Sequence, residues 1–128
     1  MSDRKPEGVS NYRDLVAWQK AMDLAEQTYR ATESFPTAER FGLTAQLRRS
    51  AVSVPSNIAE GFGRRKPIEF RRFLDIAKGS LFEFQTQAEL ARRMGWLKGD
   101  QLSSLRDLAS RVDALVSGLR RSIDTTKT

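Results

Sequence analysis

The sequence contains no cysteine and no histidine among its 128 residues. Without thiols there is no disulfide framework, and without imidazole or thiolate groups most zinc sites, histidine general bases and thiol nucleophiles are excluded. No apolar run approaches the roughly 20 residues of a membrane-spanning helix, and the first residues lack the apolar segment of a secretory signal. We therefore expect a cytoplasmic protein that is not an enzyme and that holds no metal and no cofactor.

The net charge of +6 is concentrated in one part of the chain. Residues 34–72 carry eight basic and three acidic side chains, which accounts for almost the whole excess. The basic residues that we single out as a candidate phosphate-binding set are Arg48, Arg49, Arg64, Arg65, Lys66, Arg71 and Arg72. Guanidinium groups suit phosphate because they are always charged and donate in pairs. The alternative is a solvated surface whose charges form pairs within helices, such as Glu69 with Arg72.

Apolar residues recur at steps of three and four along most of the chain, which predicts helices. We expect one helix from a cap at Asp14 to about Thr32, a second from near Ala38 to the glycines at 61–63, a third from Pro67 to a turn at 95–99, and a fourth from a cap at Asp100 to about Ile123. Short loops between them favour an all-α fold, an antiparallel up-and-down four-helix bundle. The domain is expected to span residues 12–123, with a flexible tail at 1–11 and a frayed end at 124–128.

Pro55 interrupts the second apolar stripe. Either Ser53 caps a new helix with Pro55 in its first turn, or one long helix is kinked at the proline. The stripe stays in phase across Pro55, so we expect one Pro-kinked helix.

Polar and small residues cluster around this proline: Pro55, Ser56, Asn57, Glu60 and Gly61. A catalytic interpretation would make Glu60 a base and Ser56 a nucleophile, but no activating partner is evident. The structural interpretation is that hydroxyl and amide groups satisfy backbone groups near the kink. On this interpretation we also expect Asn57 and Glu60 to hydrogen-bond facing helices. We interpret Gly79 with Ser80 as a packing notch in the third helix.

Several of these motifs resemble a known family. They are Tyr12-Arg13-Asp14-Leu15 with Trp18, the Phe35-Pro36 turn, and the segment from Gln46 to Gly61 that ends in Pro55-Ser56-Asn57-Ile58-Ala59-Glu60-Gly61. Over about residues 12–97 the chain resembles the 23S rRNA intervening-sequence proteins, a four-helix bundle family related to the accessory variability determinant of diversity-generating retroelements. The resemblance implies a long Pro-containing second helix and a homopentamer. For most members of the family the biochemical role is unknown.

We therefore predict a non-catalytic, homo-oligomeric bundle, pentameric by resemblance, that binds the backbone of RNA or DNA as an adaptor. No zinc finger, helix-turn-helix or paired RNA-binding aromatic motif is present, so binding would be driven by phosphates. Phe62, beside the basic loop, could stack on a base or pack inward. Aromatic residues such as Phe41 and Phe82 point either to subunit contacts or to a wide core stripe. The alternative function is a protein–protein interaction scaffold whose charge serves solubility or an acidic partner.

Overall fold

The computed structural model describes residues 9–127. Most of the expected tail at 1–11, and residue 128 at the expected frayed end, therefore lie outside the described residues. The elements are the 3-10 helix η1 (Tyr12–Asp14), α1 (Val16–Thr32), the 3-10 helix η2 (Thr37–Glu39), α2 (Leu43–Gly63), α3 (Pro67–Arg93), α4 (Gly99–Ser122) and the 3-10 helix η3 (Thr125–Lys127). The described residues contain four α-helices and no strand, which confirms the predicted all-α fold class.

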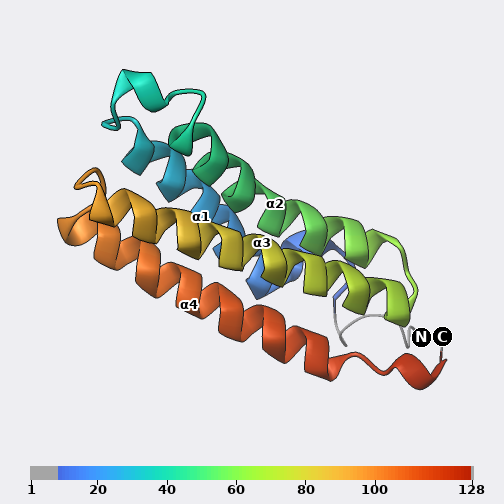
Figure 1. The fold of residues 1–128 in the computed structure, drawn as a ribbon. Coiled ribbons are helices and arrows are strands. Elements are labelled where there is room, and N and C mark those ends of the chain that lie inside the picture. The colour runs from blue at the N-terminus through green and yellow to red at the C-terminus, as the bar shows by residue number, and fades with distance from the viewer. Residues whose placement is uncertain (1–8, 128) are drawn as a thin grey trace.

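Successive helices run in opposite directions along the long axis of the molecule (Figure 1). Close to the α1–α2 connection, Arg48 of α2 contacts Tyr29 of α1. At the opposite end Arg71 of α3 contacts Thr125, just after α4. The α2–α3 turn, the start of α1 and the end of α4 therefore share one end of the bundle.

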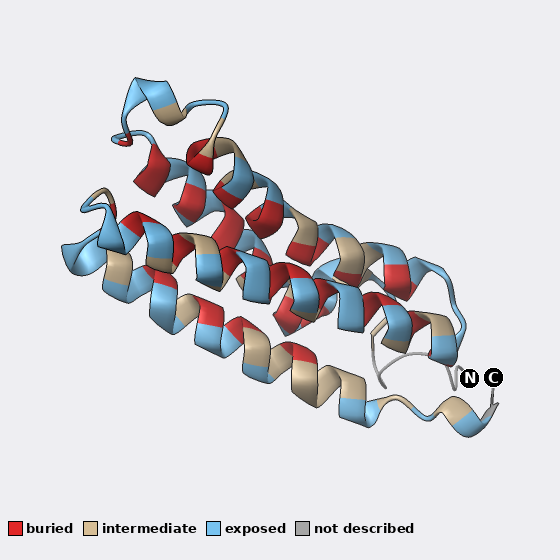
Figure 2. Cartoon of the chain, in the orientation of Figure 1, coloured by how far each residue is buried: buried red, intermediate tan, exposed pale blue. Residues whose placement is uncertain are grey.

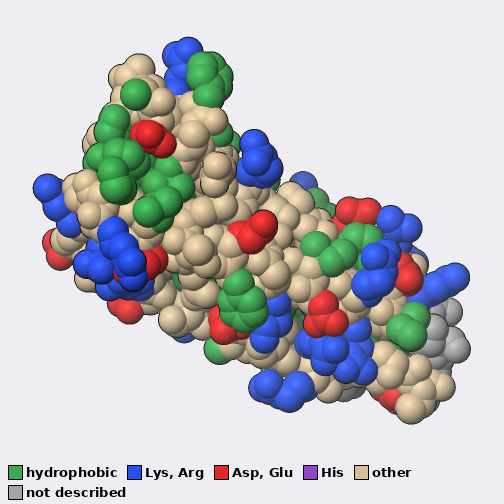
Figure 3. Space-filling model, in the orientation of Figure 1, with side chains coloured by type: hydrophobic (Ala, Val, Ile, Leu, Met, Phe, Trp, Pro, Cys, Tyr) green, Lys and Arg blue, Asp and Glu red, His purple; other side chains and the backbone are tan. Residues whose placement is uncertain are grey.

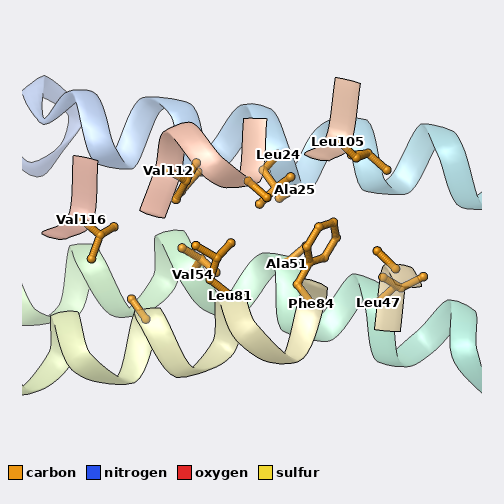
Figure 4. Packing of buried hydrophobic residues seen from close by; sticks show 14 of the residues in the cluster. Leu24, Ala25, Leu47, Ala51, Val54, Leu81, Phe84, Leu105, Val112 and Val116 are labelled. Atoms are coloured by element: carbon orange, nitrogen blue, oxygen red, sulfur yellow. The ribbon is translucent and has the colours of Figure 1, made fainter. Parts of the chain in front are cut away.

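The core is formed by one face from each helix, and Figure 2 shows the buried faces turned toward each other. Figure 4 shows side chains from all four helices pointing into the space between them, among them Leu24, Val54, Leu81, Phe84 and Val112. Phe70 and Phe84 are the largest fully buried side chains. Among the described helices, none has both the length and the hydropathy needed to cross a membrane.

Two of the predicted helix caps are wrong. Asp14 ends η1, in which the Asn11 side chain accepts the Arg13 amide hydrogen at 2.8 Å, and α1 begins two residues later. Asp100 lies in the first turn of α4 and does not cap it. A carboxylate in the first turn still interacts favourably with the positive end of the helix dipole, which explains an acidic residue there without a cap bond.

α2 begins at Leu43 and not near Ala38. Residues 37–39 form the separate turn η2, and the Glu39 side chain accepts the Leu43 amide hydrogen at 3.0 Å. The carboxylate thus satisfies one of the amides that a helix start leaves without an intrahelical acceptor. A helix starting near Ala38 would hold Glu39 in its first turn, whereas Glu39 lies before α2 and its side chain folds back onto the helix start.

Pro55 lies inside one continuous helix, so the alternative in which a new helix begins at Ser53 is wrong. The bend that we expect at Pro55 stays a prediction. Ser56 Oγ donates to the Val52 carbonyl at 2.8 Å, close to the proline that removes a backbone donor.

The bonds expected from Asn57 and Glu60 to facing helices do not form. Asn57 Nδ2 donates to the Ser53 carbonyl at 2.8 Å, and Glu60 pairs with Arg64, so both side chains stay within α2. Other residues join α2 to α3: Ser53 Oγ lies 2.8 Å from Ser80 Oγ, and Ser50 Oγ donates to Gln87 Oε1 at 2.8 Å. These two bonds satisfy partly buried polar groups at the helix contact.

The close approach between α2 and α3 occurs at Gly61 and not at Gly79. A Cβ atom at position 61 would lie 2.6 Å from the Phe73 Cβ and 3.1 Å from Phe70 Cδ1. A Cβ atom at position 79 would meet nothing within 4 Å, so the predicted notch at Gly79 is wrong. Gly61 is therefore the residue that allows the two helices to pack closely.

Gly61→Ala is expected to lower the free energy of unfolding by about 1–3 kcal/mol, because the new methyl group overlaps atoms held by the α3 backbone. Gly63→Ala is the matched control, since a Cβ there meets nothing within 4 Å. It should be neutral or stabilise by up to about 1 kcal/mol through helix propensity. Urea unfolding of the two variants measures the difference, and equal stability would contradict a close contact at Gly61.

Candidate nucleic-acid interface

Basic residues from three helices meet where α2 passes into α3. Arg64, Arg65 and Lys66 form the turn, and Pro67 opens α3. The residues that we call the basic end are Arg64, Arg65, Lys66, Arg71, Arg72, Arg120 and Arg121, the last two from the end of α4. Figure 3 shows Lys and Arg side chains spread over this end of the molecule, on the right of the view. Five of the seven predicted residues are thus brought together.

Three members of the basic end are paired with carboxylates. The pairs are Arg64 with Glu60 at 2.8 Å, Arg72 with Glu69 at 3.1 Å, and Arg120 with Asp75 at 2.5 Å. The interpretation of intrahelical pairing is therefore right for Arg64 and Arg72. Arg65, Lys66, Arg71 and Arg121 form no ion pair with any residue from 9 to 127, which leaves an excess of positive charge at this end.

Arg65 has a left-handed backbone conformation, with φ of 63°. It is the one non-glycine residue with a positive φ among those the structure describes. This conformation places the Cβ close to the carbonyl oxygen and costs about 1–2 kcal/mol, so glycine usually occupies such positions after a helix. An exposed arginine therefore occupies a position where glycine would be less strained.

Arg71 is half buried on the first turns of α3. Its Nη1 lies 3.5 Å from Thr125 Oγ1, and its buried Nε has no hydrogen-bond partner within the described chain. The side chain thus lies between α3 and the segment after α4. Its charge adds to the basic end although it is less accessible than its neighbours.

Arg48 and Arg49 do not belong to the basic end. At 1.5 Å per residue, Arg48 lies about 24 Å along α2 from Arg64. Its Nε donates to Thr32 Oγ1 at 2.9 Å, and its guanidinium stacks 4.5 Å from the Tyr29 ring centre, so Arg48 ties α2 to the end of α1. Arg49 is exposed on α2, apart from the basic end. The seven predicted residues therefore do not form a single site.

Sequence reasoning missed Arg120 and Arg121. They are about 55 residues from the α2–α3 turn in the chain, and the antiparallel path returns them to it. Arg120 is fixed there by Asp75 of α3, with its Nε donating to Oδ1. The Arg-Arg doublet was visible in the sequence, but its position became informative only with the helix order in space.

The opposite end of the bundle carries cations in a different arrangement. Arg92, Arg93 and Arg106 surround the Glu89 carboxylate at 2.9, 3.0 and 3.1 Å. Hydrogen bonds from Arg92 and then Arg93 lower the pKa of the Glu89 carboxyl to about 2, so this group stays ionised at neutral and mildly acidic pH. At this end the three guanidinium groups share the Glu89 carboxylate, whereas four cations of the basic end have no carboxylate partner among the described residues.

Aromatic rings lie directly beneath the basic end. Phe62 is only 9% exposed and packs edge-to-face on Phe70, with ring centres 5.8 Å apart. Of its two sequence interpretations, inward packing is therefore the one observed. The guanidinium groups of Arg64 and Arg72 lie 5.1 and 4.7 Å from the centre of the buried Phe73 ring. Such cation–π contacts help to hold both side chains in place.

The polar residues beside Pro55 are engaged in bonds within α2. Ser56 donates to a backbone carbonyl, and Glu60 forms the ion pair with Arg64. Across residues 9–127 there is no group of three or more acidic side chains close enough to hold a metal ion.

Comparisons with known proteins bear on most of the chain. The sequence model of a family described as 23S rRNA-intervening sequence protein matches residues 13–118. The fold is similar to a crystal structure of a protein of unknown function from the S23 ribosomal protein family of Bacteroides thetaiotaomicron VPI-5482. The TM-score is 0.76 and the identity 20%, over 83% of this chain and 96% of that one. A search of curated proteins finds no match.

Proposed function

Because the chain belongs to the 23S rRNA-intervening sequence protein family, we propose that it is a non-catalytic, homo-oligomeric adaptor that binds the phosphate backbone of RNA or DNA. The basic end is the binding surface. By family resemblance the assembly is a pentamer, and it acts in the cytoplasm. In a ring, each subunit would repeat the same excess of positive charge and so multiply the attraction for a polyanion.

The observation that carries this proposal is the α2–α3 turn. Arg65 and Lys66 are exposed cations without a described ion-pair partner, and Arg65 keeps a strained backbone conformation. Strain of this kind persists where the surrounding structure imposes it and often occurs at functional positions. A solvated surface charge would gain nothing from that conformation, whereas a phosphate contact would explain it.

Arg65→Gly should separate stability from binding. Relief of the left-handed conformation is expected to raise the free energy of unfolding by about 1 kcal/mol, while the lost charge weakens RNA binding. Lys66→Gly is the matched control, because Lys66 has an ordinary φ of −125° and should gain no stability. Urea unfolding and fluorescence anisotropy measure the two effects. Unchanged RNA affinity in Arg65→Gly would argue against a phosphate contact at this turn.

Two separate apolar surfaces support assembly. Between α1 and α2, Trp18, Met22 and Val52 line a groove of about 290 Å³. Between α2 and α3, Phe82 and Leu90 border a second groove of about 550 Å³, and each is at least half exposed. A chain with two different apolar surfaces can join to copies of itself head to tail, and such contacts close into rings when the rotation permits.

Phe82→Ser is expected to shift the protein from oligomer toward monomer, because it removes the largest exposed side chain at the α2–α3 groove. Helical content should be unchanged, since 52% of Phe82 is exposed. Ile68→Ser, at the basic end and 56% exposed, is the control and should leave assembly intact. Light scattering at micromolar concentration measures both. A wild-type protein that is monomeric there would refute the assembly half of the proposal.

The binding half is tested by measuring RNA affinity against salt concentration. Displacement of counterions by several phosphate contacts predicts a steep, linear fall of log affinity with log salt, with a slope of about −0.7 to −0.9 per contact. A flat dependence, or no binding at about 50 mM salt, would contradict phosphate-driven binding.

The α2–α3 groove also favours a second candidate, a scaffold for another protein. Its volume of about 550 Å³ would accept apolar side chains of a partner as well as those of a second copy. A partner that co-purifies after nuclease treatment, and that is lost in Phe82→Ser, would favour this function over nucleic-acid binding.

A further inference from the structure

The basic end combines exposed cations with aromatic rings that are all turned inward. Phe62, Phe70 and Phe73, the aromatic residues of the α2 end and the α3 start, are 9%, 1% and 6% exposed. Proteins that hold unpaired strands without sequence preference stack successive bases on exposed aromatic rings, which contributes about 1–3 kcal/mol per base. The three rings at this surface are buried, and the guanidinium groups of Arg64 and Arg72 lie over the Phe73 ring.

The exposed aromatic residues lie elsewhere. All aromatic residues of the chain fall within the described part, and the exposed ones are Tyr29, Phe41 and Phe82. Phe41 and Tyr29 lie toward the α1–α2 connection, and Phe82 is about 18 Å along α3 from Phe70 at 1.5 Å per residue. Tyr12 is half buried, with its ring edge-to-face against Trp18 at 5.2 Å. No exposed ring therefore accompanies the cations of the basic end in the described structure.

The cations are spread over three helices. Arg64 and Arg65 directly follow α2, Arg72 lies on α3 and Arg121 lies in the last turn of α4. The Arg64 and Arg72 guanidinium carbons are each about 5 Å from the same Phe73 ring centre, so they lie within 9.8 Å of each other. Both are held by ion pairs on their own helices, at 2.8 and 3.1 Å. The ion pairs and the ring contacts restrain both side chains before any ligand arrives, which lowers the entropic cost of binding.

A surface of cations without stacking rings suits a ligand whose bases are already paired. A duplex presents two rows of phosphates at high charge density and hides its base faces, and double-stranded RNA is recognised largely through shape and backbone contacts. An unpaired strand has about half the phosphate charge density of a duplex. Its bases would also gain little here, because this surface has no exposed aromatic ring on which they could stack. Resting on the proposed function, we infer that the ligand of the basic end is duplex nucleic acid, held by its backbones without stacking.

The test compares two probes on the full-length protein by fluorescence anisotropy at about 0.1 M salt. The first is an RNA duplex of about 20 base pairs, longer than the roughly 16 that a duplex-binding domain spans. The second is oligo(U) of about 40 nucleotides, which carries nearly the same number of phosphates in unpaired form. The duplex should bind at least about tenfold more tightly, because it presents two rows of phosphates at higher charge density and the unpaired strand finds no ring on which stacking could compensate.

Tryptophan emission, recorded in the same titrations, reports stacking independently. Trp18 lies against Tyr12 and Trp96 against Phe35, and we expect oligo(U) to leave the combined emission of these two tryptophans unchanged. Oligo(U) binding as tightly as the duplex, or quenching this emission while it binds, would overturn the inference and leave phosphate binding intact. Failure of both probes to bind would refute the proposed function itself, so the two failures are distinguishable.

Discussion

Replacing Phe70 with alanine is expected to lower the free energy of unfolding by about 3–5 kcal/mol, the range for a phenylalanine removed from a packed core. Phe70 is 1% exposed, lies against the Phe62 ring and faces Gly61 at the closest approach of α2 and α3. Its loss would leave a cavity beneath the α2–α3 turn, where the rigid backbone of two long helices permits little collapse. A loss of this size is a large fraction of the stability of a small domain.

Ile68→Ala is the matched comparison. Ile68 lies two residues earlier on α3 and is 56% exposed, so its truncation should change stability by less than about 0.5 kcal/mol. Urea or thermal unfolding followed by circular dichroism measures both variants. If Phe70→Ala were no more destabilising than Ile68→Ala, the packing of α3 on α2 at this end would differ from the structure. Should Phe70→Ala fail to fold, Phe70→Leu keeps most of the volume and should fall between the two.

Neutralising Arg65 and Lys66 together, as Arg65→Gln with Lys66→Gln, is expected to weaken RNA binding by about one to two orders of magnitude at about 0.1 M salt. Each lost phosphate contact should also reduce the slope of log affinity against log salt by about one, so the double variant should lose about two. Neither residue has a described ion-pair partner, and both are exposed, so the fold should be unaffected.

The control for this variant removes the same charge from the opposite end of the bundle. Arg40→Gln with Lys98→Gln lowers the net charge equally, and both residues are exposed in the α1–α2 and α3–α4 connections. Its salt slope should stay close to that of the wild-type protein. Equal losses in the two double variants would mean that total charge, and not the basic end, governs binding.

The number of helices and the fold class were predictable, because the spacing of apolar residues along each helix reflects the geometry of that helix alone. Helix starts were less predictable, as Glu39 shows. An acidic residue near the start of an apolar pattern can lie inside the first turn of the helix or, as observed here, before the helix, where its carboxylate accepts the Leu43 amide hydrogen. Gly61 and Gly79 illustrate a second limit. Gly61 was expected at the end of the second helix and Gly79 inside the third, and only the relative placement of α2 and α3 decides that Gly61 lies against Phe73 while Gly79 faces open space.

The candidate site was predictable where its residues are neighbours in the chain. Arg64, Arg65 and Lys66 form a basic loop in the sequence and in the structure. Arg48 was misplaced because charge counting cannot distinguish a free guanidinium from one that bonds Thr32 across a helix contact. Arg121 was missed because it is far from the α2–α3 turn in the chain, and only the antiparallel order of the helices brings the end of α4 back to that turn. The left-handed conformation of Arg65 has no sequence signature, because glycine is the usual residue there.

The even number of antiparallel helices has a practical consequence for every experiment above. α1 starts and α4 ends at the same end of the bundle as the α2–α3 turn, so a charged tag or fluorophore attached directly before α1 or directly after α4 would lie at the same end as Arg65 and Lys66. A polyhistidine or acidic tag there would add or screen charge at the surface under study. A label in the α3–α4 connection, near Lys98, would report from the far end of the molecule and leave the basic end unobstructed.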